Sequence, residues 1–289
     1  MNSITANEKI EIQSQDGVSS RITLFRNDCE EAIVIICMPA MGVWASYYEP
    51  VARTLQLSGR HVVTADLRGN GESQIRPKRG CDFGYYEMVH YDWPAVVTEA
   101  SRLFPRSQKV LLGHSLGGQL STLYMSANPG EIDALIQVAC PSVHYRGWPL
   151  PYSLRLLLMT QTFRLISGLL GYFPGKRIGF AGTEAKTHIT DWAHTTLTGR
   201  YEPKNATEAY EKRLPSLNAP ILSISFSDDP FAPKKAVERL LAKFPSAQIT
   251  HWHLAPGQVG LDSLGHVAWV KKSEPLVAKM SGWLKQVVE

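Results

Sequence analysis

The chain has 289 residues, 44% of them hydrophobic, which suits one large α/β domain with an insertion better than two independent domains. Its net charge of +4 comes from 30 basic and 26 acidic residues spread along the chain. The absence of a dense basic run argues against a nucleic-acid partner, and ordinary glycine and proline contents exclude a disordered or fibrous chain.

The predicted elements begin with two short alternating segments, 9–12 and 20–25, on either side of the turn Gln15-Asp16-Gly17, a pattern that predicts a β-hairpin. The run AIVIIC at 32–37 is continuously apolar and β-branched, as in strands buried on both faces of a parallel sheet. Strands and helices then alternate in this predicted order: helix 48–58, strand 61–65, helix 91–104, strand 109–112, a helix after Ser115, strands 134–138 and 221–226, helix 234–243, strand 248–254 and helix 274–287.

This alternation with short connections requires right-handed crossovers, so it predicts a doubly wound, mostly parallel eight-stranded sheet with the opening hairpin at one edge. The exception is the segment from about 140 to 215, which has no strand pattern. Long connections inside a compact domain are usually functional. We expect residues 1–140 and 216–289 to form an α/β core, and residues 141–215 to form a helical cap or lid over the strand ends, where such sheets bind ligands.

The cysteine pattern and the apolar segments indicate the cellular compartment that we expect for the protein. The four cysteines are irregularly spaced, without a C-x-x-C pair: Cys29, Cys37, Cys81 and Cys140. This pattern is typical of free thiols in a reducing compartment and predicts a cytoplasmic protein. The first 17 residues contain no apolar core of a signal peptide. No membrane span is expected, because Arg155, Gln161 and Arg164 interrupt the most apolar region.

A chemical motif follows the strand that begins at residue 109. Gly113-His114-Ser115-Leu116-Gly117 contains the pattern G-x-S-x-G between a buried strand and a helix-compatible stretch. In such a turn a strained serine is lifted above the sheet, and the two glycines avoid collisions of Cβ atoms with the neighbouring strand and helix. The following N–H groups converge on the same point. We predict Ser115 as a nucleophile, with a glycine-rich turn that only packs as the alternative.

A serine hydroxyl needs a general base, and the base needs an orienting acid. With this elbow the expected chain order is Ser, acid, His. Four histidines precede the expected acid and are excluded by that order: His90, His144, His188 and His194. His266 lies in the loop between the last strand and the last helix, from which it can reach the elbow. We predict it to be the base.

The remaining histidines suit structural roles. His61 begins a strand, and the side chain of His114 should point away from Ser115 into the structure. His251 and His253 share one face of a strand, where they could hold a metal, but no third ligand is spaced to join them, so packing is favoured.

The acid is expected after the strand 221–226, where the chain contains Asp228 and Asp229. Only one of these carboxylates can point at the imidazole. We favour Asp229, which lies in a D-x-x-x-P turn just before a helix, and assign Asp228 to the turn or a helix cap. Asp262 is too close in sequence to His266 to orient it well.

Four segments in this order make the chain resemble the α/β-hydrolase superfamily along nearly its whole length. They are DLRGNGES at 66–73, GHSLGG at 113–118, SDDPFAP at 227–233 and LGHV at 264–267. The resemblance implies structural roles for Asp66 and Arg68. The chain is most similar to a poorly characterised subgroup of predicted serine hydrolases, with a P-A-x-G-V turn after the third strand and the segment GYFPGKR, here 171–177.

The oxyanion turn departs from the superfamily pattern. Most relatives have His-Gly after the third strand, where this chain has Pro39-Ala40. The resemblance places the first oxyanion donor at the backbone N–H of Met41 and the second at that of Leu116. We expect the oxyanion hole to survive this change, because small and large residues both leave a backbone N–H free; a misdirected Met41 amide would cost about 10²–10³ in turnover.

These residues predict acyl transfer to water through an acyl-enzyme, with no metal or organic cofactor. The apolar segment 150–173 is expected to line or cover a pocket for a hydrophobic ester, with Trp148 and Trp192 as its walls, although packing within the cap or a homodimer surface would explain the same residues. Two alternatives remain: the same triad acting on C–C, thioester or amide bonds or as an acyltransferase, and a catalytically silent scaffold that binds a small apolar ligand or a partner.

Overall fold

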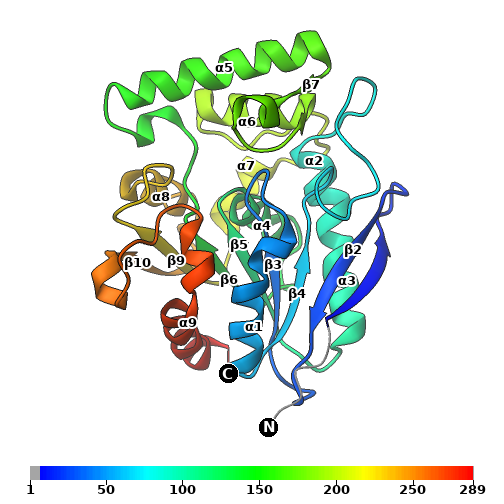
Figure 1. The fold of residues 1–289 in the computed structure, drawn as a ribbon, viewed down its shortest axis with the longest axis vertical. Helices are drawn as coiled ribbons and strands as arrows, with labels where there is room; N and C mark the ends of the chain where they lie inside the picture. Colours follow the sequence, from blue (N-terminus) through cyan, green and yellow to red (C-terminus); the bar gives the residue numbers. More distant parts are fainter. Residues whose placement is uncertain (1–6, 289) are drawn as a thin grey trace.

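A computed structural model describes residues 7–288, so part of the N-terminal segment in which no signal peptide is expected lies outside the described residues. Eight strands form one sheet in the order β1-β2-β4-β3-β5-β6-β9-β10 (Figure 1). Its strands are β1 (Glu8–Gln13), β2 (Ser19–Phe25), β3 (Val34–Met38), β4 (His61–Ala65), β5 (Lys109–His114), β6 (Ala134–Val138), β9 (Pro220–Phe226) and β10 (Gln248–Leu254). The neighbours from β4 to β10 pair in parallel, while β2 is antiparallel to both β1 and β4. The predicted fold class and the edge position of the hairpin are confirmed.

Helices cover both faces of this sheet. They are α1 (Glu49–Leu57), α2 (Tyr85–Glu87), α3 (Trp93–Leu103), α4 (Leu116–Ala127), α5 (Tyr152–Leu170), α6 (Lys186–Thr198), α7 (Tyr210–Arg213), α8 (Lys234–Leu241) and α9 (Glu274–Val287). On one face α1 packs against α9, while α3 and α4 lie on the other (Figure 1). Strands β3, β4 and β6 are buried along their whole length, which explains their predominantly apolar sequences.

One helical region differs from the sequence-based expectation of a single helix over 91–104. Helical structure begins earlier, at Tyr85, and a π-helical turn, Met88–Asp92, precedes α3. Pro94 lies in the first turn of α3 and has no N–H to donate. The widened turn directly before Pro94 therefore lies where the regular pattern of helical hydrogen bonds is interrupted.

The loop after β4 is held by the half-buried Asp66 and the buried Arg68, in agreement with the structural roles expected for them. Asp66 accepts hydrogen bonds from the backbone N–H groups of Ala45 (2.7 Å) and Glu72 (3.0 Å). Arg68 is buried and forms ion pairs of 2.6 Å with both Asp16 and Asp92. Because breaking a buried pair costs about 3–5 kcal/mol, these contacts fix the loop firmly to the hairpin and to the helical segment before α3.

Residues between β6 and β9 lie beyond the carboxyl ends of the parallel strands. There α5 packs along α6 at one end of the molecule (Figure 1). A two-residue ribbon of β7 (Tyr172–Phe173) and β8 (Glu184–Ala185) joins them, which the sequence did not predict because so short a ribbon has no alternating pattern. Within residues 7–288, no helix is long and apolar enough to cross a membrane. All four cysteines are free.

Candidate active site

The turn between β5 and α4 has the strained geometry that its sequence predicts. Ser115 has φ 51° and ψ −116°, in a region that L-residues rarely adopt. A Cβ atom on Gly117 would lie 2.3 Å from the carbonyl oxygen of Met38, and one on Gly113 would lie 2.3 Å from the Cα atom of Gly118. Both glycines are therefore required for the close approach of β3, β5 and α4.

Three side chains from separate loops form one hydrogen-bonded chain. The Nε2 atom of His266 lies 3.0 Å from the Oγ atom of Ser115, and its Nδ1 atom lies 2.8 Å from the Oδ2 atom of Asp229. Ser115 follows β5, Asp229 follows β9, and His266 lies in the loop between β10 and α9. Asp229 is buried, and its other oxygen accepts hydrogen bonds from the N–H groups of Phe231 and Ala232. The structure thus brings together the three residues that the sequence singles out.

The neighbouring Asp228 has a different task. Its Oδ2 atom accepts hydrogen bonds from the Ser263 hydroxyl (3.0 Å) and from the N–H groups of Leu264 (2.9 Å) and Gly265 (3.1 Å). Burial by itself raises the pKa of Asp228, but these hydrogen bonds together outweigh it and hold the pKa below its ordinary value. Asp228 therefore fixes the loop that immediately precedes His266.

The expected oxyanion donors, Met41 and Leu116, lie on the turn after β3 and at the first residue of α4. Within residues 7–288 neither backbone N–H donates to another group of the protein. The turn after β3 is fixed by a buried hydrogen bond, in which the N–H of Ala40 donates to the hydroxyl of Tyr48 over 3.0 Å. That hydroxyl also lies 2.5 Å from the Nδ1 atom of His114, the histidine inside the elbow.

Tyr48 and His114 thus form a buried link between the oxyanion turn and the elbow. Burial, with the neighbouring His266, lowers the pKa of His114 well below its ordinary value, so its imidazole is neutral. Because a hydroxyl group can both accept and donate, Tyr48 can hold the Ala40 N–H and the Nδ1 atom of His114 at the same time. The sequence indicated a structural role for His114 but gave no sign of Tyr48, which lies 66 residues away.

We predict that Tyr48→Phe destabilises the protein by about 1–3 kcal/mol, because it leaves the buried Ala40 N–H and the Nδ1 atom of His114 without partners. The turnover number should fall with little change in KM, since the oxyanion turn loses its support. Urea denaturation and ester hydrolysis measure the two effects. Tyr47→Phe, at the adjacent ring, is the matched control, and equal effects of both substitutions would contradict the role assigned to the Tyr48 hydroxyl.

Aromatic residues border the histidine. The Phe231 ring is 62% exposed and lies 5.5 Å from the His266 ring, a neighbour that sequence analysis did not single out. Trp148 donates its indole N–H to the carbonyl of Pro230, next to Asp229. Trp192, by contrast, is buried within the cap helices against Phe180. The contact of Trp148 keeps it beside the site, while a role for either tryptophan toward a substrate stays a prediction.

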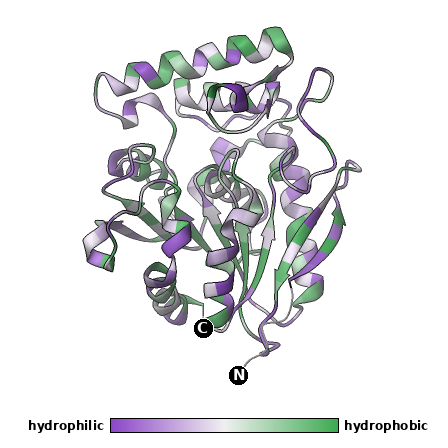
Figure 2. Cartoon of the chain, in the orientation of Figure 1, coloured by the Kyte–Doolittle hydropathy of each residue, from purple (hydrophilic) through white to green (hydrophobic). Residues whose placement is uncertain are grey.

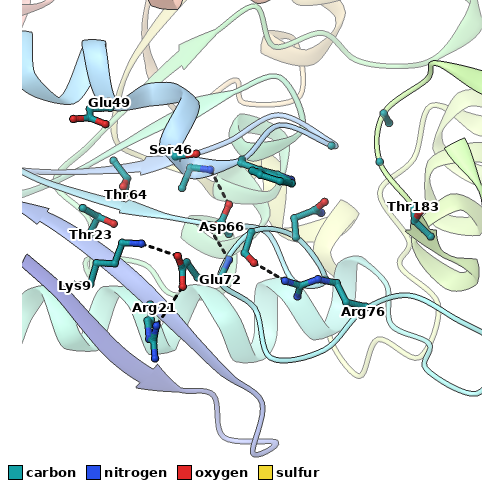
Figure 3. A pocket seen from close by; sticks show the side chains of 18 of the residues that line it. Lys9, Arg21, Thr23, Ser46, Glu49, Thr64, Asp66, Glu72, Arg76 and Thr183 are labelled. Carbon is teal, nitrogen blue, oxygen red and sulfur yellow. Dashed lines mark hydrogen bonds and ion pairs between the residues drawn. The ribbon is translucent and has the colours of Figure 1, made fainter. Parts of the chain in front are cut away.

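Two cavities border the turn after β3. One, of about 440 Å³, is lined by residues of the turn after β3, including Trp44, and by Val267 next to His266. The other, of about 1020 Å³, is a polar cleft between the opening hairpin, the loop after β4 and residues 176–183 (Figure 3). In that cleft Glu72 is paired with Lys9 and Arg21. None of the three hydrogen-bonded residues lines either cavity.

The other histidines lie outside this arrangement. His251 and His253 each hydrogen-bond through one ring nitrogen to the hydroxyl of Ser225, over 2.8 Å. His188 is buried and lies 3.1 Å from the carboxylate of Glu184. No group of three or more metal-ligating side chains suited to a metal ion occurs in the described part of the chain.

A mostly parallel sheet with a strained serine at the turn after β5, and with an acid and a histidine after later strands, defines an α/β-hydrolase. The family model described as serine aminopeptidase, S33, matches residues 29–258. The chain therefore belongs to this family of the α/β-hydrolase superfamily.

Individual relatives are more distant. The chain is 28% identical over 135 residues to lysophospholipase L2 of Escherichia coli strain K12, an alignment that covers 46% of this chain and only 39% of that protein. It is 26% identical over 219 residues to a probable lysophospholipase L2 of Haemophilus influenzae, with 66% of each chain covered. An esterase structure from Pyrococcus furiosus matches with a TM-score of 0.64 at 15% identity, over all of this chain and 96% of that one, which supports the fold alone.

Proposed function

We propose that the protein is a serine hydrolase that cleaves hydrophobic carboxylic esters through a Ser115–His266–Asp229 triad. The observation that carries the proposal is the pair of hydrogen bonds through His266, of 3.0 Å to Ser115 and 2.8 Å to Asp229. A strained serine within reach of a base, and a base oriented by a buried acid, are what nucleophilic catalysis by serine requires.

In this mechanism the Nε2 atom of His266 takes the proton of the Ser115 hydroxyl as the oxygen attacks the substrate carbonyl. Asp229 holds the ring with its proton on Nδ1 and stabilises the imidazolium that forms. The backbone N–H groups of Met41 and Leu116 bind the oxyanion. His266 then protonates the leaving alcohol, and water, activated by the same base, hydrolyses the acyl-enzyme. Each step uses groups of the protein, substrate and water only.

Hydrophobic substrates are supported by the surroundings of His266, where Phe231 and Val267 are apolar and Trp148 stands nearby. The names of the two lysophospholipase relatives agree with an ester that carries an acyl chain. We further propose that residues 141–215 act as a cap that selects the substrate, because α5 and α6 lie beyond the strand ends where Ser115 is placed. A cytoplasmic location and a homodimer remain predictions.

A series of p-nitrophenyl esters from acetate to decanoate tests the substrate class. We expect kcat/KM to rise with chain length, because each methylene buried against apolar side chains contributes about 0.8 kcal/mol, or roughly fourfold. Phe231→Ser should flatten that rise while leaving acetate hydrolysis nearly unchanged. An equal kcat/KM along the whole series in the unmodified protein would contradict the hydrophobic acyl substrate, although not the triad itself.

A further inference from the structure

The helix α5 carries a row of exposed leucines on its outer side. Leu154, Leu158, Leu165 and Leu169 are 50%, 68%, 65% and 70% exposed. At 100° per residue these four side chains fall within an arc of about 60° along some 22 Å of helix. Figure 2 shows the apolar turns of α5 at the end of the molecule. The expectation that this segment lines a pocket therefore does not hold for these leucines, which face away from the core.

The opposite side of α5 is the one that packs. Its buried residues, Ser153, Thr160, Phe163 and Ser167, are small or polar apart from the phenylalanine. The helix is thus inverted relative to an ordinary surface helix, whose apolar face is buried. Four aligned exposed leucines need an apolar partner, because single exposed apolar residues are common but a contiguous row is not.

The charged residues of α5 and of the sequence on either side of it are all basic. No aspartate or glutamate occurs from residue 134 to residue 183, a stretch that contains five basic residues: Arg146, Arg155, Arg164, Lys176 and Arg177. The next two carboxylates, Glu184 and Asp191, are buried. On the helical wheel Arg155 and Arg164 lie on opposite sides of the leucine row, about 100° and 80° from Leu154. Each is exposed and can extend outward beside the leucines.

We propose that α5 is an interfacial helix that binds the surface of an anionic phospholipid membrane. Leucines at the centre of the face and arginines at its margins are the arrangement by which a helix lies in the headgroup region, with its apolar side chains inserted and its cations on the lipid phosphates. The absence of acidic residues from α5 favours this partner over a second copy of the chain, since two such faces would bring Arg155 and Arg164 of both copies together without a carboxylate of α5 to compensate them. The inference does not depend on the proposed activity.

Sedimentation with sucrose-loaded vesicles tests it, with the full-length chain carrying Ser115→Ala so that no lipid is hydrolysed. We expect binding to phosphatidylcholine vesicles that contain phosphatidylglycerol, weaker binding to phosphatidylcholine alone, and weakening by salt. Leu158→Ser with Leu165→Ser should lower the partition coefficient by about tenfold for each leucine. Arg155→Gln with Arg164→Gln should lower it about fivefold for each arginine, on the anionic vesicles only.

The matched control is Leu57→Ser, because Leu57 is 72% exposed but lies at the end of α1, away from the cap. It should leave vesicle binding unchanged. Failure of the Ser115→Ala protein to sediment with anionic vesicles would overturn the proposal, as would equal losses from the Leu57 and Leu158/Leu165 substitutions. A dimer detected by light scattering that the leucine substitutions dissociate, without vesicle binding, would identify the face as a self-association surface and also overturn it.

Discussion

Replacing Ser115 by alanine should lower kcat for a soluble p-nitrophenyl ester by at least about 10⁴-fold, because no other group can take the place of the attacking oxygen. The protein should remain folded. Alanine has a Cβ atom like serine and accepts the same backbone strain at φ 51°, and the Ser115 hydroxyl bonds only to His266 within the described residues. Steady-state kinetics and circular dichroism measure the two results.

A variant of equal activity would place the nucleophile elsewhere and would leave the strained turn as a packing device. A variant that is inactive because it unfolds would be recognised by its spectrum. His266→Ala then serves as a second variant, since His266 lies in a loop and is partly exposed. It should lose activity to a similar extent, because residues that act as one unit do not contribute independently.

Asp229→Asn should lower kcat by roughly 10³–10⁴-fold. The amide keeps the size of the carboxylate but no longer holds the proton on the Nδ1 atom of His266, so the imidazole turns to the tautomer that cannot accept from Ser115. KM should change little, because Asp229 is buried and does not face the substrate. Kinetics with a soluble ester check this split between kcat and KM.

Asp228→Asn is the matched control, one residue away in the same turn. It removes acceptors of three hydrogen bonds from the loop 263–265, so we expect a loss of about 1–3 kcal/mol in unfolding free energy and only a modest loss of activity. If the Asp228 variant lost activity while the Asp229 variant retained it, the assignment of the two aspartates would be reversed.

Much of the framework could be predicted because it depends on local patterns. Strands β4 and β6 and helix α9 have the predicted bounds, since each is a mostly apolar or amphipathic segment between clear breaks. The positions of Ser115 and His266 followed from the strand–turn–helix context and from the order of residues along the chain.

Other features depend on contacts that the sequence does not display. The D-x-x-x-P turn favoured Asp229 over Asp228, but the separate role of each aspartate is seen only in the geometry, where Asp229 faces His266 and Asp228 holds the loop before it. The hydrogen bond between Tyr48 and His114 joins two residues that are 66 positions apart, and no sequence motif links them. The sequence of α5 could not separate leucines that line a pocket from leucines on the surface, because helical periodicity marks an apolar face without saying whether that face is covered.

Labelling with a fluorophosphonate probe tests the central claim most directly, since the probe forms a covalent bond only with a serine activated by a neighbouring base. The account predicts that the unmodified protein is labelled at Ser115, that Ser115→Ala is not labelled, and that Asp229→Asn is labelled far more slowly while Asp228→Asn is labelled readily. Absence of labelling in the correctly folded, unmodified protein would contradict the account. It would favour a catalytically silent scaffold, with the Pro39–Met41 turn as the departure that disables it.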